Sequence, residues 1–164
     1  MRLTTRTNLA MRTLMFCAVN DRRTVRKVEI AEACNASENH LAQVIRLLGQ
    51  HGFIHAVRGR NGGMQLARPA GEINVGSVFR VFESELPFAE CFSGAENHCP
   101  LTEFCWLRPA LVKALDAFYA TLDAMTLADL TAGNDKLERL LRLPALPHHS
   151  PVDQHVLQRI AHAY

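Results

Sequence analysis

Three cysteines lie close together in the second half of the chain, at positions 91, 99 and 105. Thiolates are soft ligands that select zinc, copper(I) or iron–sulfur clusters. Zinc sites usually contain cysteine pairs two residues apart, so the wider spacing of Cys91, Cys99 and Cys105 favours a larger group, such as an iron–sulfur cluster. His98 directly precedes Cys99 and keeps a zinc site of three cysteines and one histidine open as an alternative.

The remaining two cysteines, Cys17 and Cys34, lie on or beside apolar faces of expected helices, and we expect both in the core. Arginines interrupt the apolar runs near the start of the chain. The longest run, 14–19, is too short for a signal peptide or a membrane span. We therefore expect a cytoplasmic protein without membrane association, in which thiols stay reduced. In such a compartment, clustered cysteines bind metal or sense redox state more often than they form structural disulfides.

The charges divide the chain into a basic and an acidic half. Although the formal net charge is only +2, 12 of the 18 Lys and Arg residues lie within positions 1–80, together with five of the 16 Asp and Glu residues. A basic half is typical of a segment that meets a polyanion such as DNA. A hydrophobic content of 48% excludes an extensively disordered chain. We expect no enzyme activity, because neither a nucleophile–base motif nor a phosphate-binding loop is recognisable.

The pattern of residues 4–50 predicts a helix-turn-helix. Helices are expected over 4–19 and 25–33, followed by a turn at 34–36 and a third helix with Ser37 as its N-cap. In this third helix an apolar stripe repeats with helical spacing, which leaves a polar face opposite. Polar side chains on such a helix face can form hydrogen bonds with base edges or with phosphates. The candidate DNA-binding residues on this helix are Ser37, Asn39, His40, Gln43 and Arg46.

Two short strand-like segments, 53–57 and 64–67, follow the third helix. The residues between them are rich in glycine and arginine, which is typical of a hairpin turn with a basic tip. A basic hairpin after a helix-turn-helix predicts a winged helix, in which Arg58, Arg60 and Asn61 contact DNA. The expected fold is therefore mainly α-helical, with a small β-hairpin wing.

A long helix is expected from Pro109 to about Asp123. Its apolar residues Leu111, Leu115, Phe118 and Leu122 repeat at a 4-3-4 spacing, which is typical of a coiled-coil seam. Packing of this helix on its own domain explains the same pattern. Because helix-turn-helix proteins usually bind palindromic operators as dimers, we interpret it as the dimerisation helix of a homodimer bound to double-stranded DNA.

Four segments follow from these patterns. Residues 1–83 form the winged helix-turn-helix domain, 84–106 the cysteine-containing loop, and 107–143 the dimerisation helices. Residues 144–164 form a proline-containing extension.

These features together resemble the small winged-helix iron–sulfur repressors. The resemblance spans residues 1–143 and rests on the opening Met1-Arg2-Leu3-Thr4, on Arg12, on the wing sequence 57–63 and on the three cysteines. It implies a homodimer with an iron–sulfur cluster, 4Fe–4S in preference to 2Fe–2S, held near the dimer interface by the three cysteines. It also implies release from the operator when the cluster is nitrosylated or lost.

Within this family, the opening Ser37-Glu38-Asn39-His40 of the third helix and the segment 126–130 resemble the nitric-oxide sensors named NsrR. Asn8 and the seven-residue spacer between Cys91 and Cys99 resemble the iron regulators named RirA. We rank NsrR first, RirA second and IscR third. IscR-like proteins place a histidine three residues after the last cysteine, where this chain has Arg108. In some NsrR proteins the fourth ligand is an aspartate of the other subunit, at the position that Asn8 occupies in this chain. The neutral amide of Asn8 is a poorer ligand than that carboxylate. The fourth ligand stays open between Asn8 and His98. The expected signal is nitric oxide; iron status and a cluster-free cysteine redox switch are the alternatives.

Overall fold

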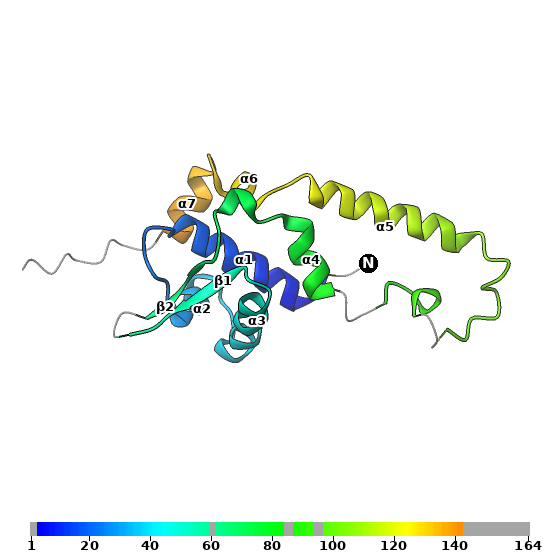
Figure 1. The fold of residues 1–164 in the computed structure, drawn as a ribbon, viewed down its shortest axis with the longest axis horizontal. Coiled ribbons are helices and arrows are strands. Elements are labelled where there is room, and N and C mark those ends of the chain that lie inside the picture. The colour runs from blue at the N-terminus through cyan, green and yellow to red at the C-terminus, as the bar shows by residue number, and fades with distance from the viewer. Residues whose placement is uncertain (1–2, 60–61, 84–86, 94–96, 143–164) are drawn as a thin grey trace, which may run out of the picture.

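The computed structural model describes residues 3–59, 62–83, 87–93 and 97–142. Its elements follow the chain as α1 (Thr5–Val19), α2 (Lys27–Ala33), α3 (Glu38–Gln50), β1 (Ile54–Val57), β2 (Gly63–Leu66), η1 (Ala70–Glu72), α4 (Val75–Glu83), η2 (Glu90–Phe92), α5 (Leu107–Asp123), α6 (Leu127–Thr131) and α7 (Asp135–Leu141). The prediction of a mainly α-helical fold with a β-hairpin is confirmed. Helix α5 extends away from the body, and the cysteine segment lies at its far end (Figure 1).

Helix α1 is the centre of the body. It packs against α3, α4, α6, α7 and β2, which together enclose it on several sides. Leu14 and Phe16 are fully buried, and Thr7 and Thr13 are buried as well. The hydroxyl of Thr13 donates a hydrogen bond of 2.8 Å to the carbonyl of Leu9, so this buried polar group has a partner. The helix begins at an N-cap residue, Thr4, whose side chain accepts a hydrogen bond from the N–H of Thr7.

The helix-turn-helix consists of α2, a tight turn and α3. Asn35 adopts a positive φ of 47° in this turn, a conformation that Asn tolerates better than most residues. The guanidinium of Arg12 on α1 donates to the carbonyl of Cys34 at 3.2 Å and so fixes the turn to the central helix. Ser37 occupies the predicted N-cap position of α3, but its side chain makes no capping hydrogen bond there.

The wing is an antiparallel pair in which Ile54 lies opposite Leu66 and Val57 opposite Gly63. Its strand β2 also pairs with Val25 through two backbone hydrogen bonds with Met64, of 3.0 and 2.8 Å. The expected helix from residue 25 therefore begins only at Lys27, because the backbone of Val25 is extended and bonded to the wing. This pairing ties the hairpin to the residues that precede α2.

The end of the described chain returns to the body. Thr126 and Asp129 form a capping box at α6, and Leu127 is fully buried. Asn20 donates from its side chain to the carbonyl of Leu141 at 2.9 Å, which joins α7 to the end of α1. The core around α1 thus contains residues from both ends of the sequence. The expected extension 144–164 lies outside the described residues, and within those residues no helix has the length and hydropathy needed to cross a bilayer.

Candidate DNA-binding surface and cysteine segment

The polar face of α3 points away from the core. Leu41, Val44 and Leu48 are buried and hold the helix on the body. The five residues predicted to contact DNA are all exposed: Ser37, Asn39, His40, Gln43 and Arg46. An ion pair of 2.9 Å between Lys27 and Glu38 joins the starts of α2 and α3. The structure thus presents amide, imidazole and guanidinium groups together on one helix, as a groove-reading surface requires.

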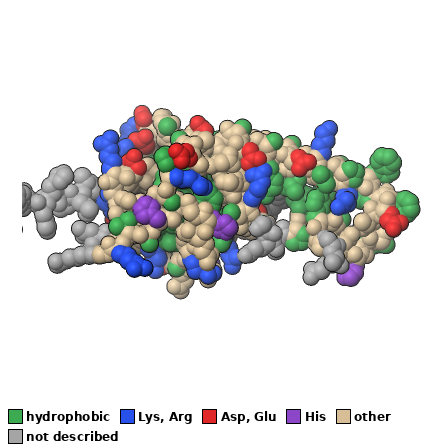
Figure 2. Space-filling view, viewed as in Figure 1, with side chains coloured by type: hydrophobic (Ala, Val, Ile, Leu, Met, Phe, Trp, Pro, Cys, Tyr) green, Lys and Arg blue, Asp and Glu red, His purple; other side chains and the backbone are tan. Residues whose placement is uncertain are grey.

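Basic side chains gather on one edge of the body. Figure 2 shows Lys and Arg side chains along the lower edge, where Figure 1 places α3 and the wing, whereas Asp and Glu side chains are mixed with Lys and Arg along the upper edge. At the wing, Arg58 is exposed, and Gly59 adopts a φ of 114° at the start of the turn. Arg60 and Asn61 lie outside the described residues. Their role in DNA binding stays a prediction.

The cysteine segment is organised by short hydrogen-bonded turns. Asn97 accepts from the N–H of Cys99 at 3.1 Å, and the hydroxyl of Thr102 donates to the carbonyl of Cys99 at 2.7 Å. The carboxylate of Glu90 accepts from the N–H of His98 at 2.9 Å and so connects η2 to the turn around Cys99. These contacts link the neighbourhoods of the first two cysteines.

The chemistry of the three thiols suits a soft metal group. Cys91, Cys99 and Cys105 are free and half-buried. In the described ranges, however, the structure contains no group of three or more Cys, His, Asp or Glu side chains that is gathered around one metal position. Of the two candidate fourth ligands, His98 is exposed beside Cys99, and Asn8 is exposed on α1. The donor types fit an iron–sulfur cluster, and the identity of all four ligands stays a prediction.

The other two cysteines are buried, as the sequence predicted. Burial raises the pKa of the Cys17 thiol to about 12, and burial also raises the pKa of Cys34. Because the thiolate is the reactive form, a raised pKa lowers the reactivity of both thiols.

The predicted dimerisation helix has two different halves. Towards its end, Phe118 and Leu122 pack on the core of their own chain, and the ring of Phe118 lies 6.1 Å from that of Phe79 on α4. Towards its start, Leu111 and Leu115 are half-buried. Just before α5, Phe104 is 83% exposed and Trp106 is 91% exposed, and Figure 2 shows hydrophobic side chains along α5 to its far end. Large apolar exposure of this kind marks interaction surfaces. The homodimer contact itself stays a prediction.

Helices α4 and α5 are joined by a pair of charged side chains. Arg80 donates two hydrogen bonds to the carboxylate of Asp123, both of 2.6 Å, and its guanidinium lies 4.4 Å from the ring centre of Tyr119. The bidentate contact lowers the pKa of Asp123 and raises that of Arg80. Asn74 donates to the backbone carbonyl of Asp123 at 2.6 Å. Sequence patterns contain no signal for these contacts, because 43 residues separate Arg80 from Asp123.

A second long-range contact joins α4 to α1. One carboxylate oxygen of Glu83 accepts hydrogen bonds from the backbone N–H of Thr4 at 2.9 Å, from the Thr4 hydroxyl at 3.1 Å and from the hydroxyl of Thr7. Glu83 is the last residue of α4 and precedes the cysteine segment in the chain. The junction between the cysteine segment and the DNA-binding body is thus fixed at the start of the central helix.

Together, the helix-turn-helix, its paired wing and the exposed polar face of α3 define the class of winged-helix transcriptional regulators. Residues 3–133 match the Rrf2 family model, which is described as an iron-dependent transcriptional regulator, and this chain belongs to the Rrf2 family.

Individual relatives cover almost the whole chain. Protein aau3 of Rhizobium meliloti is 43% identical over 152 residues, which are 92% of this chain and 99% of that protein. The HTH-type transcriptional regulator NsrR of Geobacillus kaustophilus is 43% identical over 143 residues, 87% of this chain and 97% of that protein. The solved structure of T. potens IscR is similar with a TM-score of 0.64 and 27% identity, and covers 89% of this chain and 94% of IscR. The chain is a transcriptional regulator and not an enzyme.

Proposed function

We propose that this chain is an iron–sulfur repressor that binds a palindromic operator as a homodimer and leaves it in response to nitric oxide. The observation that carries the proposal is the placement of three free, half-buried cysteines in one segment that leads directly into α5. The identity of 43% to a regulator named NsrR supports nitric oxide as the signal.

In this proposal α3 enters the major groove. Asn39 and Gln43 would pair with base edges, while Arg46 reaches a guanine or a phosphate. Arg58 on the wing would contact the neighbouring backbone or minor groove. Because a dimer must present its two α3 helices about one turn of DNA apart, a small change in their spacing lowers affinity for the operator.

Cys91, Cys99 and Cys105 would hold the cluster as thiolates, with His98 of the same chain or Asn8 of the second subunit as the candidate fourth ligand. When bound, an iron–sulfur cluster with an incomplete set of thiolate ligands offers iron that a small molecule such as nitric oxide can reach. The half-buried thiols leave such a group partly accessible from solvent.

The contacts of Arg108 connect the cysteine segment to α5. Its Nε atom donates to the carbonyl of Cys91 at 3.3 Å, and its guanidinium lies 6.0 Å from the ring centre of Phe92. A change at Cys91 therefore acts on the first turn of α5. At the other end of this helix, the Arg80–Asp123 pair transfers a movement to α4. Glu83, at the end of α4, accepts a hydrogen bond from Thr4 at the start of α1, and α1 packs on α3. This physical route joins the sensor segment to the reading helix.

Two other signals have specific support. The family description names iron dependence, which favours iron status as an alternative signal acting on the same three cysteines. The chemistry of thiols themselves gives the other alternative, a cluster-free redox switch, because a cysteine can be oxidised to a sulfenic acid or a disulfide without any metal. Iron and sulfide content after anaerobic reconstitution separates the second alternative from the cluster proposal.

The experiment that tests the proposal is anaerobic fluorescence anisotropy with a duplex selected from a random-sequence pool by the reconstituted protein. We expect the protein to bind this duplex tightly and to lose at least about tenfold in affinity when nitric oxide is added. An iron chelator at the same concentration is expected to leave the affinity unchanged. Loss of binding with the chelator alone would favour iron status. Binding that responds only to peroxide, in a protein without iron, would contradict the proposal.

A further inference from the structure

The first residue of α3 is an acidic residue that is paired with α2. Glu38 directly follows the N-cap residue Ser37 and forms the 2.9 Å ion pair with Lys27, the first residue of α2. The side chain of Glu38 is 53% exposed and that of Lys27 is 41% exposed. An ion pair with this much exposure contributes little to the stability of a fold. Both side chains can therefore make contacts outside the chain at little cost.

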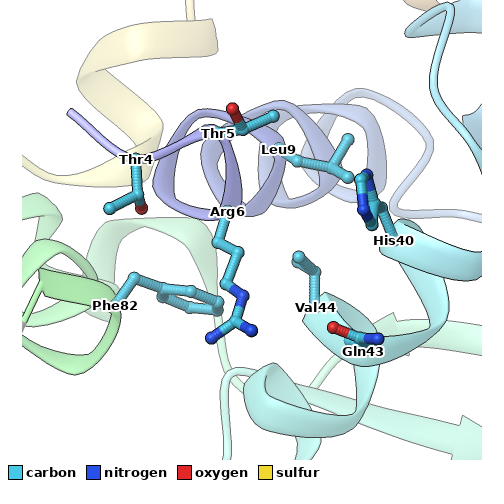
Figure 3. A pocket seen from close by; sticks show the side chains of 8 residues that line it. All are labelled: Thr4, Thr5, Arg6, Leu9, His40, Gln43, Val44 and Phe82. Carbon is cyan, nitrogen blue, oxygen red and sulfur yellow. The ribbon is translucent and has the colours of Figure 1, made fainter. Parts of the chain in front are cut away.

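Glu38 lies in one row of side chains with Arg46. Positions 38, 42 and 46 are spaced at i, i+4 and i+8, which places their side chains one behind the other along the helix. All three residues are exposed, and the small side chain of Ala42 in the middle lets another molecule approach the helix closely. On the other flank of α3, His40 and Gln43 line a hollow of about 410 Å³ between α1, α3 and α4 (Figure 3). The row that begins at Glu38 thus forms the flank of the reading face that starts beside α2.

A carboxylate in this row distinguishes between bases. In the major groove, cytosine presents an amino donor at N4, whereas guanine presents acceptors at N7 and O6, and thymine presents an acceptor at O4. An ionised carboxylate only accepts hydrogen bonds, so it is attracted by cytosine and repelled by guanine and thymine. The ion pair with Lys27 uses Oε2 of Glu38, and the second oxygen, Oε1, can accept from a base. The N-terminal residues of a recognition helix are the ones that contact base edges.

Lys27 lowers the electrostatic cost of bringing a carboxylate to DNA. Without a neighbouring cation, Glu38 would carry a negative charge towards the phosphates and weaken binding to any duplex. The ammonium group of Lys27 offsets this charge. It has three N–H donors, so it can hold Oε2 of Glu38 and contact a phosphate at the same time. The pair can therefore approach the DNA as a unit.

We propose that Glu38 selects the base at one position of each operator half-site. Its carboxylate accepts a hydrogen bond from N4 of cytosine and excludes guanine and thymine at that position. Lys27 is a positioning residue, because it holds the carboxylate through Oε2. This inference deepens the proposed function and rests on it, since it requires α3 in the major groove. It assigns base selection to an acidic residue, beside the amide, imidazole and guanidinium groups of the same helix.

The test compares the sequences that the full chain and its variants select from a random pool of DNA duplexes after anaerobic reconstitution. The parent protein is expected to select cytosine at one position in each half-site. Glu38→Gln is expected to select adenine there, because a Gln side chain pairs with N6 and N7 of adenine. Glu32→Gln removes another exposed carboxylate, on α2, and should keep cytosine. Identical base preferences of the parent protein and Glu38→Gln would overturn the proposal.

Affinities for defined duplexes give the size of the effect. Replacing the selected C·G pair by G·C in both half-sites is expected to weaken binding of the parent protein about tenfold or more. The same replacement is expected to weaken binding of Glu38→Gln less than about threefold, because an amide both donates and accepts. If Glu38→Gln instead binds every duplex more tightly by one common factor, Glu38 only repels phosphates and the proposal is wrong.

Two substitutions of Lys27 test its positioning role. Lys27→Met is expected to weaken binding to all duplexes and to reduce the preference for cytosine, because the carboxylate of Glu38 loses its cation and its orientation. Lys27→Arg keeps a cation beside Glu38 and is expected to retain the preference. A purely structural or electrostatic role would change affinity and leave the preference as it is. Full preference for cytosine in Lys27→Met would therefore overturn the role given to Lys27.

Failure of this inference can be distinguished from failure of the proposed function. A parent protein that selects a palindrome and releases it on addition of nitric oxide, but whose base preferences do not depend on Glu38, would overturn only the role of Glu38. A parent protein that enriches no sequence from the pool would overturn the proposed function and this inference together.

Discussion

Glu83 and Thr4 join the end of α4 to the start of α1: one carboxylate oxygen accepts from both the backbone N–H and the hydroxyl of Thr4, at 2.9 and 3.1 Å. The same oxygen accepts from the buried hydroxyl of Thr7. The contact spans 79 positions of sequence and lies eight residues before Cys91. It therefore lies between the segment proposed to sense the signal and the helix that supports α3.

Glu83→Ala is expected to lower the free energy of unfolding by about 1–3 kcal/mol, because the Thr7 hydroxyl and the Thr4 N–H lose their shared acceptor. Urea denaturation measures this loss. Glu72→Ala, at an exposed carboxylate in η1, is the matched control and should change stability by less than about 0.5 kcal/mol. An equal effect of the two substitutions would show that the Glu83 contacts do not stabilise the body.

Gly63→Ala tests the attachment of the wing. A Cβ atom at this position would lie 2.3 Å from the backbone oxygen of Val25 and 2.9 Å from the Thr24 side chain. Because a backbone atom cannot turn aside, the pairing of Val25 with Met64 must open, at a cost of about 1–3 kcal/mol. The midpoint temperature of thermal unfolding and the affinity for DNA are both expected to fall. At Gly71 an added Cβ has open space, so Gly71→Ala should leave DNA binding unchanged. Intact binding in Gly63→Ala would contradict this account of the wing.

The Arg80–Asp123 pair predicts a pH dependence. Its hydrogen bonds lower the pKa of Asp123 below the ordinary value of about 3.9, so the folded state holds the charged carboxylate more strongly than the unfolded state does. This contribution to stability is present above the unfolded pKa and is lost as the pH falls through the folded pKa. Carboxyl ¹³C NMR should show Asp123 returning towards its ordinary pKa in Arg80→Met. Asp129, whose pKa is lowered by Thr126, should not move in that variant. An Asp123 that titrates normally in the parent protein would refute the prediction.

The two proposed kinds of DNA contact should respond differently to substitution. If Arg46 on α3 reads a base, Arg46→Ala is expected to reduce the binding free energy for the selected duplex by about 1–3 kcal/mol. The loss for unrelated DNA is expected to be much smaller. Arg58→Ala on the wing should weaken both duplexes and reduce the slope of log affinity against log salt concentration by about 1. Lys136→Ala, at an exposed lysine on α7, is the control for net charge. Anisotropy over a series of salt concentrations measures all three, and equal effects of Arg58→Ala and Lys136→Ala would count against a wing contact.

Local patterns were sufficient to predict most of the fold. The apolar stripe of the third expected helix, formed by Leu41, Val44 and Leu48, placed α3 correctly. The glycines between the two strand-like runs placed the hairpin. These signals are short-range, because the residues that cap or turn a segment lie within a few positions of it.

Long-range contacts could not be predicted in the same way. Val25 has the apolar character of a helix residue, and only its pairing with Met64 shows that its backbone is extended. The 4-3-4 repeat of α5 is compatible with a partner helix or with the chain's own core, and for Phe118 the structure shows the core. The hollow that α1, α3 and α4 line together (Figure 3) depends on three helices meeting, which no single segment encodes. The cysteine ligands remain a prediction from residue type and resemblance.

The central claim is that Cys91, Cys99 and Cys105 hold an iron–sulfur cluster. Substituting any one of them by Ser is expected to abolish the cluster, because three thiolates supply most of its ligands. Cys34→Ser is the matched control, since Cys34 is buried near α3 and is not a proposed ligand.

Native mass spectrometry of the full chain after anaerobic reconstitution measures this most directly, because cluster mass and dimer state come from one spectrum. The account predicts a dimer with the mass of one 4Fe–4S cluster per chain, retained in Cys34→Ser and absent from Cys91→Ser, Cys99→Ser and Cys105→Ser. A parent protein that carries one zinc ion or no metal, or a cluster that survives all three cysteine substitutions, would contradict it.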